Sequence, residues 1–251
     1  MPSAAKQIPL FPETEEPDPL SGFSIRESGR AKRLSIKVFP RGRVEVVVPK
    51  RTRPRDVQSF VAEHRDWIKK TRAKFAELHP PEPFQLPVQF YLAGIDRRFV
   101  VVYESRDGYK RVRYKLRGDT LRLSGDVSDQ RQCVTALKRF LSETARSCFE
   151  PKLRELSEST GNNFKRMHVR GQKTCWGSHS CSGTISINYC LLFLKPELIR
   201  YLMIHELCHA KHMNHSRRFW AHVGRFEPDY RRLDRLLSDS WKQIPTWVGI
   251  Y

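Results

Sequence analysis

Hydrophobic and polar residues alternate over residues 33–38 and again over residues 44–48, as they do in strands with one buried face. Between these runs, Pro40-Arg41-Gly42-Arg43 has the composition of a turn, and Pro49 follows the second run. The pattern therefore predicts a β-hairpin. Apolar residues then recur at helical spacing over residues 54–78, so we expect a helix that packs on this hairpin.

Short apolar runs predict four more strands, at residues 90–92, 98–103, 110–116 and 120–124, with a turn at Gly118-Asp119. A helix is expected over residues 129–149. Pro151 should interrupt it, because proline lacks the backbone N–H that a helix interior needs, and the helix should resume over residues 153–157.

Further along the chain, alternation predicts strands at residues 164–169 and 184–188 on either side of a loop at residues 171–182. Pro196 suits the first turn of a helix that continues to residue 209. Together the elements predict an α+β protein, in which a strand-rich N-terminal part precedes a mostly helical part with a small sheet.

Charge divides the chain into three parts. Residues 1–22 are rich in proline, carry a net charge of −3 and are expected to form a disordered tail. Residues 23–125 form a basic, strand-rich region with a net charge of +14, and residues 126–251 form a second region of +8. The total of +19 favours contact with polyanions, so a nucleic acid or a nucleotide is a candidate partner of the basic surface.

The composition also excludes several classes of protein. The chain has no apolar run long enough to cross a bilayer, and its first residues lack the pattern of a secretion signal. The six cysteines contain no C-x-x-C pair, which disfavours a disulfide scaffold, a zinc ribbon and an iron–sulfur cluster. We therefore expect a cytoplasmic protein with reduced thiols and no membrane contact.

The strongest chemical signal is His205-Glu206-Leu207-Cys208-His209, an H-E-x-x-H motif. Residues four apart lie on one helix face, so His205 and His209 can bind the same ion. Glu206 lies about 100° around the helix from His205, where it is better placed to take a proton from a metal-activated water than to bind the metal.

A catalytic zinc site needs a third protein ligand and one open position. His215 follows Asn214, a residue type that tolerates the left-handed turn that often ends a helix, so a reversal there would return His215 to the ion. His212 is the competing candidate, although it would crowd the other two imidazoles. The second nitrogens of the ligands should donate to carboxylates or carbonyls, for which Glu227 and Asp229 are candidates.

More motifs follow one another along the chain, and these are Trp176-Gly177-Ser178, Ile185-Ser186-Ile187-Asn188, the run 201–209, Asn214-His215-Ser216, Phe219-Trp220 and Glu227-Pro228-Asp229. Their order resembles the YgjP-like (SprT-related) zinc metallopeptidase family. The resemblance extends upstream through residues 30–49 and Trp67-Ile68, and so covers roughly residues 25–240. Two positions depart from the family pattern, because Cys175 and His179 stand where the family usually has Arg and Cys.

The resemblance implies a zincin-like metalloprotease core of the gluzincin kind, with His205, His209 and His215 on Zn²⁺ and Glu206 as general base. We therefore expect a zinc metallohydrolase, an endopeptidase whose partner is a peptide or protein substrate. Two alternatives are a zinc-dependent nucleoside triphosphate pyrophosphohydrolase, for which no Gly-rich phosphate loop is evident, and a nucleic-acid-associated protease or binding protein.

Five residues are further candidates for contact with substrate. Trp176, Gly177 and Ser178 could line the cleft, since glycine allows a backbone to approach closely. Asn188 ends the strand at residues 184–188, which we expect to be an edge strand able to pair with an extended peptide. Tyr201 is a candidate stabiliser of the oxyanion. Phe219 and Trp220 are expected to serve packing.

Overall fold

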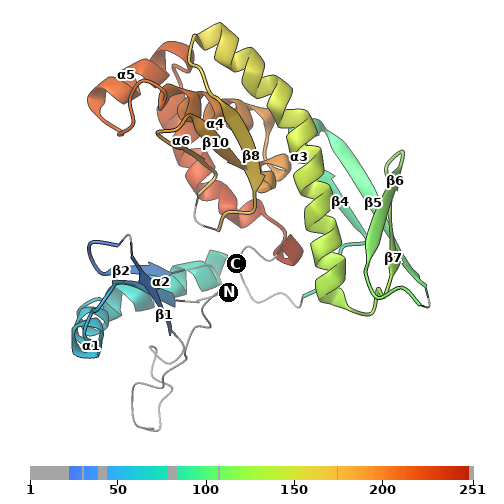
Figure 1. Cartoon of the computed structure of the whole chain (residues 1–251), viewed down its shortest axis with the longest axis horizontal. Coiled ribbons are helices and arrows are strands. Elements are labelled where there is room, and N and C mark those ends of the chain that lie inside the picture. The colour runs from blue at the N-terminus through green and yellow to red at the C-terminus, as the bar shows by residue number, and fades with distance from the viewer. Residues whose placement is uncertain are drawn as a thin grey trace. The chain divides into compact units, whose positions relative to one another are not determined.

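The computed structural model describes residues 23–29, 31–38, 44–78, 84–106, 108–173 and 175–248, and for residues 75–78 it describes the backbone only (Figure 1). The chain divides into two compact units, one ending at Pro83 and the other running from Phe84 to Ile250. The predicted tail at residues 1–22 lies outside the described residues. The division that we expected after residue 125 falls inside the second unit.

The first unit contains one three-stranded sheet and two helices. The predicted hairpin is present as β2 (Ser35–Val38) and β3 (Val44–Pro49), which pair antiparallel, and its turn lies outside the described residues. A strand that the sequence analysis missed, β1 (Phe23–Ser28), pairs parallel with the other edge of β3. The core of this unit joins the buried valines of β3 to Val57, Val61 and Ile68 of the helices.

The helix predicted over residues 54–78 is two helices, α1 (Pro54–Glu63) and α2 (Arg65–Leu78). The chain leaves the helical conformation at His64, whose backbone N–H donates to the carbonyl of Val61. The His64 ring donates from Nδ1 to the carbonyl of Phe60 at 2.8 Å. This local bonding satisfies the end of α1 and allows α2 to start in a new direction.

The second unit begins with a four-stranded sheet in the order β4-β5-β7-β6, and its strands are β4 (Gln89–Leu92), β5 (Arg97–Ser105), β6 (Arg113–Arg117) and β7 (Thr120–Gly125). The four predicted strands are thus confirmed. Gly118 has φ 56° in the turn before β7, a left-handed conformation that favours glycine. One face of the sheet contacts the helix that follows, through the rings of Phe90, Phe99 and Phe140.

That helix, α3 (Gln130–Thr160), is continuous through Pro151, so the predicted interruption is wrong. Pro151 is exposed, and water can reach the carbonyl that proline leaves without a donor. On the opposite face, Phe149 and Leu153 are fully buried, and their packing holds the helix together across the proline. Asp129 caps the start by accepting from the backbone N–H groups of Arg131 and Gln132.

A second small sheet follows α3 in the order β8-β10-β9, made of β8 (Arg166–Arg170), β9 (Gly177–His179) and β10 (Thr184–Asn188). The sequence analysis placed β9 in a loop. β10 pairs parallel with β8 and antiparallel with β9, so the prediction of an edge strand at residues 184–188 is wrong. β10 is the central strand of the three, and it is buried along nearly its whole length between its two partners.

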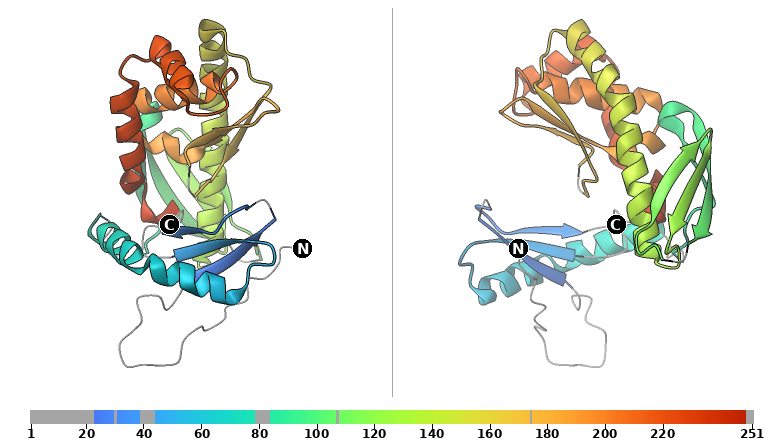
Figure 2. Two further views of the ribbon diagram at one scale, coloured as in Figure 1. Left: turned by 90° about the vertical axis from the view of Figure 1, so that its left-hand side faces the viewer. Right: turned by 45° about the vertical axis from the view of Figure 1, so that its right-hand side comes forward.

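The remaining elements are the 3₁₀ segments Ala93–Ile95, Tyr189–Phe193, Ser240–Gln243 and Thr246–Val248 and the helices α4 (Pro196–Cys208), α5 (Arg217–Phe226) and α6 (Tyr230–Asp239). Within this unit, α3 lies between the four-stranded sheet on one side and β8, β10 and α4 on the other (Figures 1 and 2). The α+β class is confirmed. No helix in the described part of the chain is long and apolar enough to span a bilayer.

Candidate metal centre

Helix α4 carries the H-E-x-x-H motif at its C-terminal end, with His209 as its C-cap. Pro196 stands in its first turn, as predicted, and nine of its thirteen residues are buried, which makes α4 the central helix of this half of the unit. A helix held on most of its surface keeps its side chains in fixed directions. His205 and His209 therefore project from a rigid support.

The structure brings His205, His209 and His215 together. One ring nitrogen from each lies within 4.8 Å of the other two, and the Nε2 atoms of His205 and His215 are 3.0 Å apart. Among the described residues, this is the cluster of His, Cys, Asp and Glu side chains that could hold a metal ion. His215 is exposed, so the site opens to solvent on that side.

The chain reverses between α4 and α5, as expected, but by a different route from the predicted one. Asn214 is not in the left-handed region, since the non-glycine residues with positive φ in the described part are Arg51 and Asp96. Instead, the N–H groups of residues 209–212 donate to carbonyls of the last turn of α4. Ser216 then caps α5 by accepting from the backbone N–H of Phe219.

Hydrogen bonds on the far side of two rings determine which nitrogen faces the cluster. His209 donates from Nδ1 to the carbonyl of His212 at 2.9 Å, and because a carbonyl only accepts, Nε2 of His209 keeps its lone pair. His205 Nδ1 lies 3.5 Å from the hydroxyl of Tyr201, which itself donates to Asp234 at 2.7 Å. Both imidazoles thus present a bare Nε2, the form that binds metal.

These contacts also decide between earlier candidates. His212 contributes its backbone carbonyl, and its ring lies 5.7 Å from the ring of His222, outside the cluster. The expected roles of Glu227 and Asp229 are wrong, because Glu227 pairs with Arg200 and Asp229 with an arginine of its own helix. Asp234, reached through Tyr201, is the carboxylate behind His205, and sequence spacing carried no signal for it.

Phe219 forms the floor of the cluster. Its ring centroid lies 4.9 Å from that of His205, 4.4 Å from that of His209 and 4.9 Å from that of His215, and the side chain is fully buried. Phe219 therefore packs as predicted, but it packs against all three imidazoles at once. Trp220 covers His215 from the outside, with rings stacked at 5.6 Å.

Glu206 lies beside the cluster and is held in a tight, dry position. Its side chain is buried, and its Oε2 has no hydrogen-bond partner among the described residues. The backbone of Gly177 lies so close that a Cβ there would stand 2.7 Å from Oε1. Burial raises the pKa of the Glu206 carboxyl to about 8.

The donor set fits a divalent cation. Burial, together with His209 and His215 nearby, lowers the pKa of His205 to about 3, and burial also lowers the pKa of His209. Imidazoles with a lowered pKa stay neutral at ordinary pH, and the lone pairs on their facing nitrogens are available to bind a metal ion. A cation here would also compensate the buried Glu206 carboxylate, which otherwise has no partner for one oxygen.

The substrate-contact candidates lie around the centre in different ways. Trp176 is buried, stacks on Trp241 at 3.9 Å and donates from its indole to the carbonyl of Leu237. Ser178 is exposed on β9, next to Gly177. Asn188 is fully buried and its amide donates to carbonyls of the preceding loop, including that of Cys175 at 3.2 Å.

Tyr201 is buried behind His205, so its hydroxyl orients that ring. Substrate contact by these residues stays a prediction. His179, one of the departures from the family pattern, bonds from Nδ1 to the backbone carbonyl of Glu206 at 2.6 Å and so ties β9 to α4. No disulfide joins the six cysteines.

Comparison with known proteins gives one family and two structures. Residues 32–240 match the family described as YgjP-like, metallopeptidase domain. Similar solved structures include the metallopeptidase zymogen abylysin of Pyrococcus abyssi, which is 28% identical and covers 36% of this chain and 92% of its own, with a TM-score of 0.33. The metallopeptidase zymogen jannalysin of Methanocaldococcus jannaschii is 19% identical and covers 37% of this chain and 96% of its own, with a TM-score of 0.34. No curated protein matches the chain.

Proposed function

Because the chain belongs to the YgjP-like metallopeptidase family, we propose that it is a zinc-dependent endopeptidase whose general base is Glu206. The observation that carries this proposal is the convergence of three histidine nitrogens within 4.8 Å, next to a buried carboxylate oxygen without a partner. His205, His209 and His215 would hold the ion. Three nitrogen ligands with one open side are the donor set of catalytic zinc sites.

A bound zinc ion polarises the scissile carbonyl and makes a nearby water more acidic. Glu206 accepts the proton of the attacking water on its carboxylate and passes it to the leaving amine. Its confinement between α4 and Gly177 limits how far the carboxylate can swing between these two positions. Phe219 and Tyr201 keep the imidazoles aligned while this happens.

β9 supplies the edge along which a peptide could lie. It pairs with β10 on one side only, and Gly177 places it against Glu206. An extended substrate that adds to this edge would pass the carboxylate with its scissile bond.

The direct test combines metal analysis with an activity screen. Purified wild-type protein is expected to contain one zinc per chain and to cleave casein. Glu206→Gln should keep the zinc and lose turnover, and His215→Ala should lose the zinc. Glu206→Gln protein that cleaves casein as fast as wild type would exclude Glu206 as the general base. Full zinc occupancy of His215→Ala would exclude His215 as the third ligand.

The same protein should be incubated with nucleoside triphosphates. Hydrolysis of a triphosphate without cleavage of casein would favour the pyrophosphohydrolase alternative.

A further inference from the structure

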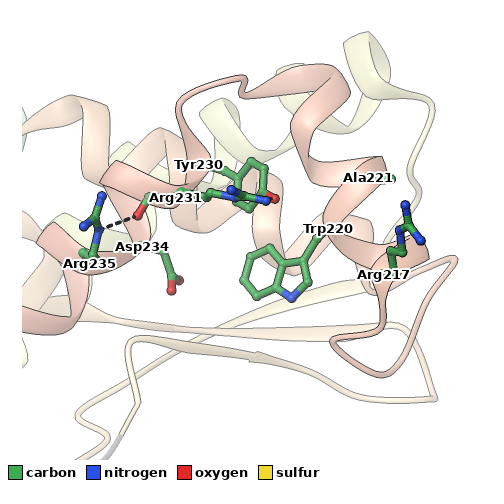
Figure 3. A pocket seen from close by; sticks show the side chains of 7 residues that line it. All are labelled: Arg217, Trp220, Ala221, Tyr230, Arg231, Asp234 and Arg235. Atoms are coloured by element: carbon green, nitrogen blue, oxygen red, sulfur yellow. Dashed lines mark hydrogen bonds between the residues drawn. The ribbon is translucent and has the colours of Figure 1, made fainter.

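A hollow of about 860 Å³ lies between α5 and α6 (Figure 3). Its walls include Arg217, Arg231 and Arg235, the rings of Trp220 and Tyr230, and the carboxylate of Asp234. We call it the arginine pocket. Three guanidinium groups and one carboxylate line the hollow, so it carries an excess of positive charge.

The arginine pocket shares two walls with the metal centre. Trp220 stacks on Tyr230 at 5.2 Å and on His215 at 5.6 Å, so one indole faces both the pocket and a proposed zinc ligand. Asp234 accepts from Tyr201, whose hydroxyl lies behind His205. A peptide held at the zinc therefore reaches the pocket within a few residues, since an extended chain advances about 3.3 Å per residue.

The pocket arginines differ in their ion pairs from their neighbour Arg232. Among the described residues, none of Arg217, Arg231 and Arg235 forms an ion pair, whereas Arg232 on the same helix pairs with Glu197 and Asp229. A guanidinium group without a carboxylate partner at a peptidase site is available to bind one from the substrate.

Two of these arginines are fixed through Nε, which leaves their terminal nitrogens available. Arg235 donates from Nε to the carbonyl of Arg231 at 3.3 Å (Figure 3), and Arg231 donates from Nε to the hydroxyl of Tyr230 at 3.2 Å. The paired terminal N–H groups match the two oxygens of a carboxylate.

We propose that the arginine pocket selects peptide substrates with Asp or Glu within a few residues of the scissile bond. The inference rests on the proposed peptidase function. A peptide carboxylate is the ligand that follows from the proposed peptidase function, and a triphosphate, which the same excess of positive charge would also attract, is an outcome of the test below.

The first experiment reads cleavage sites. Zinc-loaded protein is incubated with a library of proteome-derived peptides, and cleavage positions are identified by mass spectrometry. Wild type should cut about tenfold more often near acidic residues than near their amide counterparts, the size expected for hydrogen bonds to a charged group. In Arg231→Glu/Arg235→Glu the preference should reverse toward Lys and Arg.

A matched control keeps net charge from explaining the result. Arg218→Glu/Arg225→Glu changes the same charge on exposed positions of α5 outside the pocket, and it should retain the acidic preference. Because the readout is a ratio between peptides in one sample, a general loss of folded protein cannot produce the reversal. Zinc stoichiometry provides the check that each variant is folded.

The second experiment separates the pocket from the catalysis. Binding of fluorescein-labelled hexaglutamate is followed by anisotropy, with hexaglutamine as the neutral probe. Hexaglutamate should bind about tenfold more weakly to the pocket variant than to the control variant.

Cleavage without an acidic preference overturns the pocket inference and leaves the peptidase proposal standing. Pocket-dependent binding of hexaglutamate without any cleavage supports the pocket and overturns the peptidase proposal. Equal binding of hexaglutamate by both variants, or pocket-dependent binding of ATP in its place, overturns the pocket inference.

Discussion

Replacing Gly177 with alanine tests whether the position of the Glu206 carboxylate controls catalysis. Gly177 lies in β9 without a positive φ, so alanine can adopt its backbone conformation without strain. The added Cβ, however, would stand 2.7 Å from Oε1 of Glu206 and 3.0 Å from its Cδ and Cγ. The substitution therefore acts through space on the carboxylate that we propose as general base, and it leaves the chemistry of that group unchanged.

The size of the effect follows from these distances. Ordinary contacts between carbon atoms are about 3.5–4.0 Å, so the carboxylate must retreat by roughly 0.5–1 Å. Glu206 is only 4% exposed and has little free space to move into. A displacement of about 1 Å costs on the order of 10²-fold in rate, so kcat/KM should fall by about that factor. Overpacking should lower the free energy of unfolding by about 1–3 kcal/mol.

The assay measures kcat/KM on a casein-derived peptide, zinc content and urea unfolding for each variant. Gly224→Ala is the matched control, because its Cβ would meet Tyr230 at an ordinary 3.4 Å and a helical Ala is favoured over Gly by about 1 kcal/mol.

In the Glu206→Gln background, Gly177→Ala should lower the residual kcat/KM by less than about threefold, since both changes act on one group. If Gly177→Ala alone keeps kcat/KM within about threefold of wild type, or loses its zinc, displacement of the base is not the cause.

Four further predictions follow from the same geometry. Tyr201→Phe removes the hydroxyl behind His205 and should raise the zinc Kd about tenfold in chelator competition, and an unchanged Kd would contradict the orienting role. Phe219→Ala empties the floor under three imidazoles and should cost about 3–5 kcal/mol in chemical unfolding of the metal-free protein, with Phe219→Leu between it and wild type. A chelator should abolish casein cleavage, stoichiometric zinc should restore it, and free zinc at 100 times Kd should stabilise the fold by about 2.7 kcal/mol. If the basic region at residues 23–125 binds nucleic acid, affinity should fall steeply with salt, and a flat curve would remove that partner.

Local patterns in the sequence were enough to predict most of the elements. Alternation predicted β2 and β3, and short apolar runs predicted the four strands β4 to β7. The misses share a physical cause. β9 has only three residues and exists through its pairing with β10, and α3 passes Pro151 because long-range packing on its other face outweighs one lost hydrogen bond.

For the candidate site, the H-E-x-x-H spacing and one more histidine beyond the helix predicted which three imidazoles converge, because residues four apart share a helix face. The sequence could not predict what surrounds them. Asp234 lies 29 residues beyond His205 along the chain, and the contact of Gly177 with Glu206 joins a short strand to a helix. Such contacts depend on how α4, α6 and β9 pack, and no local spacing encodes them.

The sequence by itself determined the kind of chemistry that we propose, because the types of residue and their spacing along one helix are properties of neighbouring positions in the chain. Only the tertiary structure decided how that chemistry is held: a phenylalanine beneath three rings, a glycine against the carboxylate, and three arginines from two helices around one hollow. These groups meet because burial of apolar surface brings distant segments together, and that cooperative packing belongs to the whole domain.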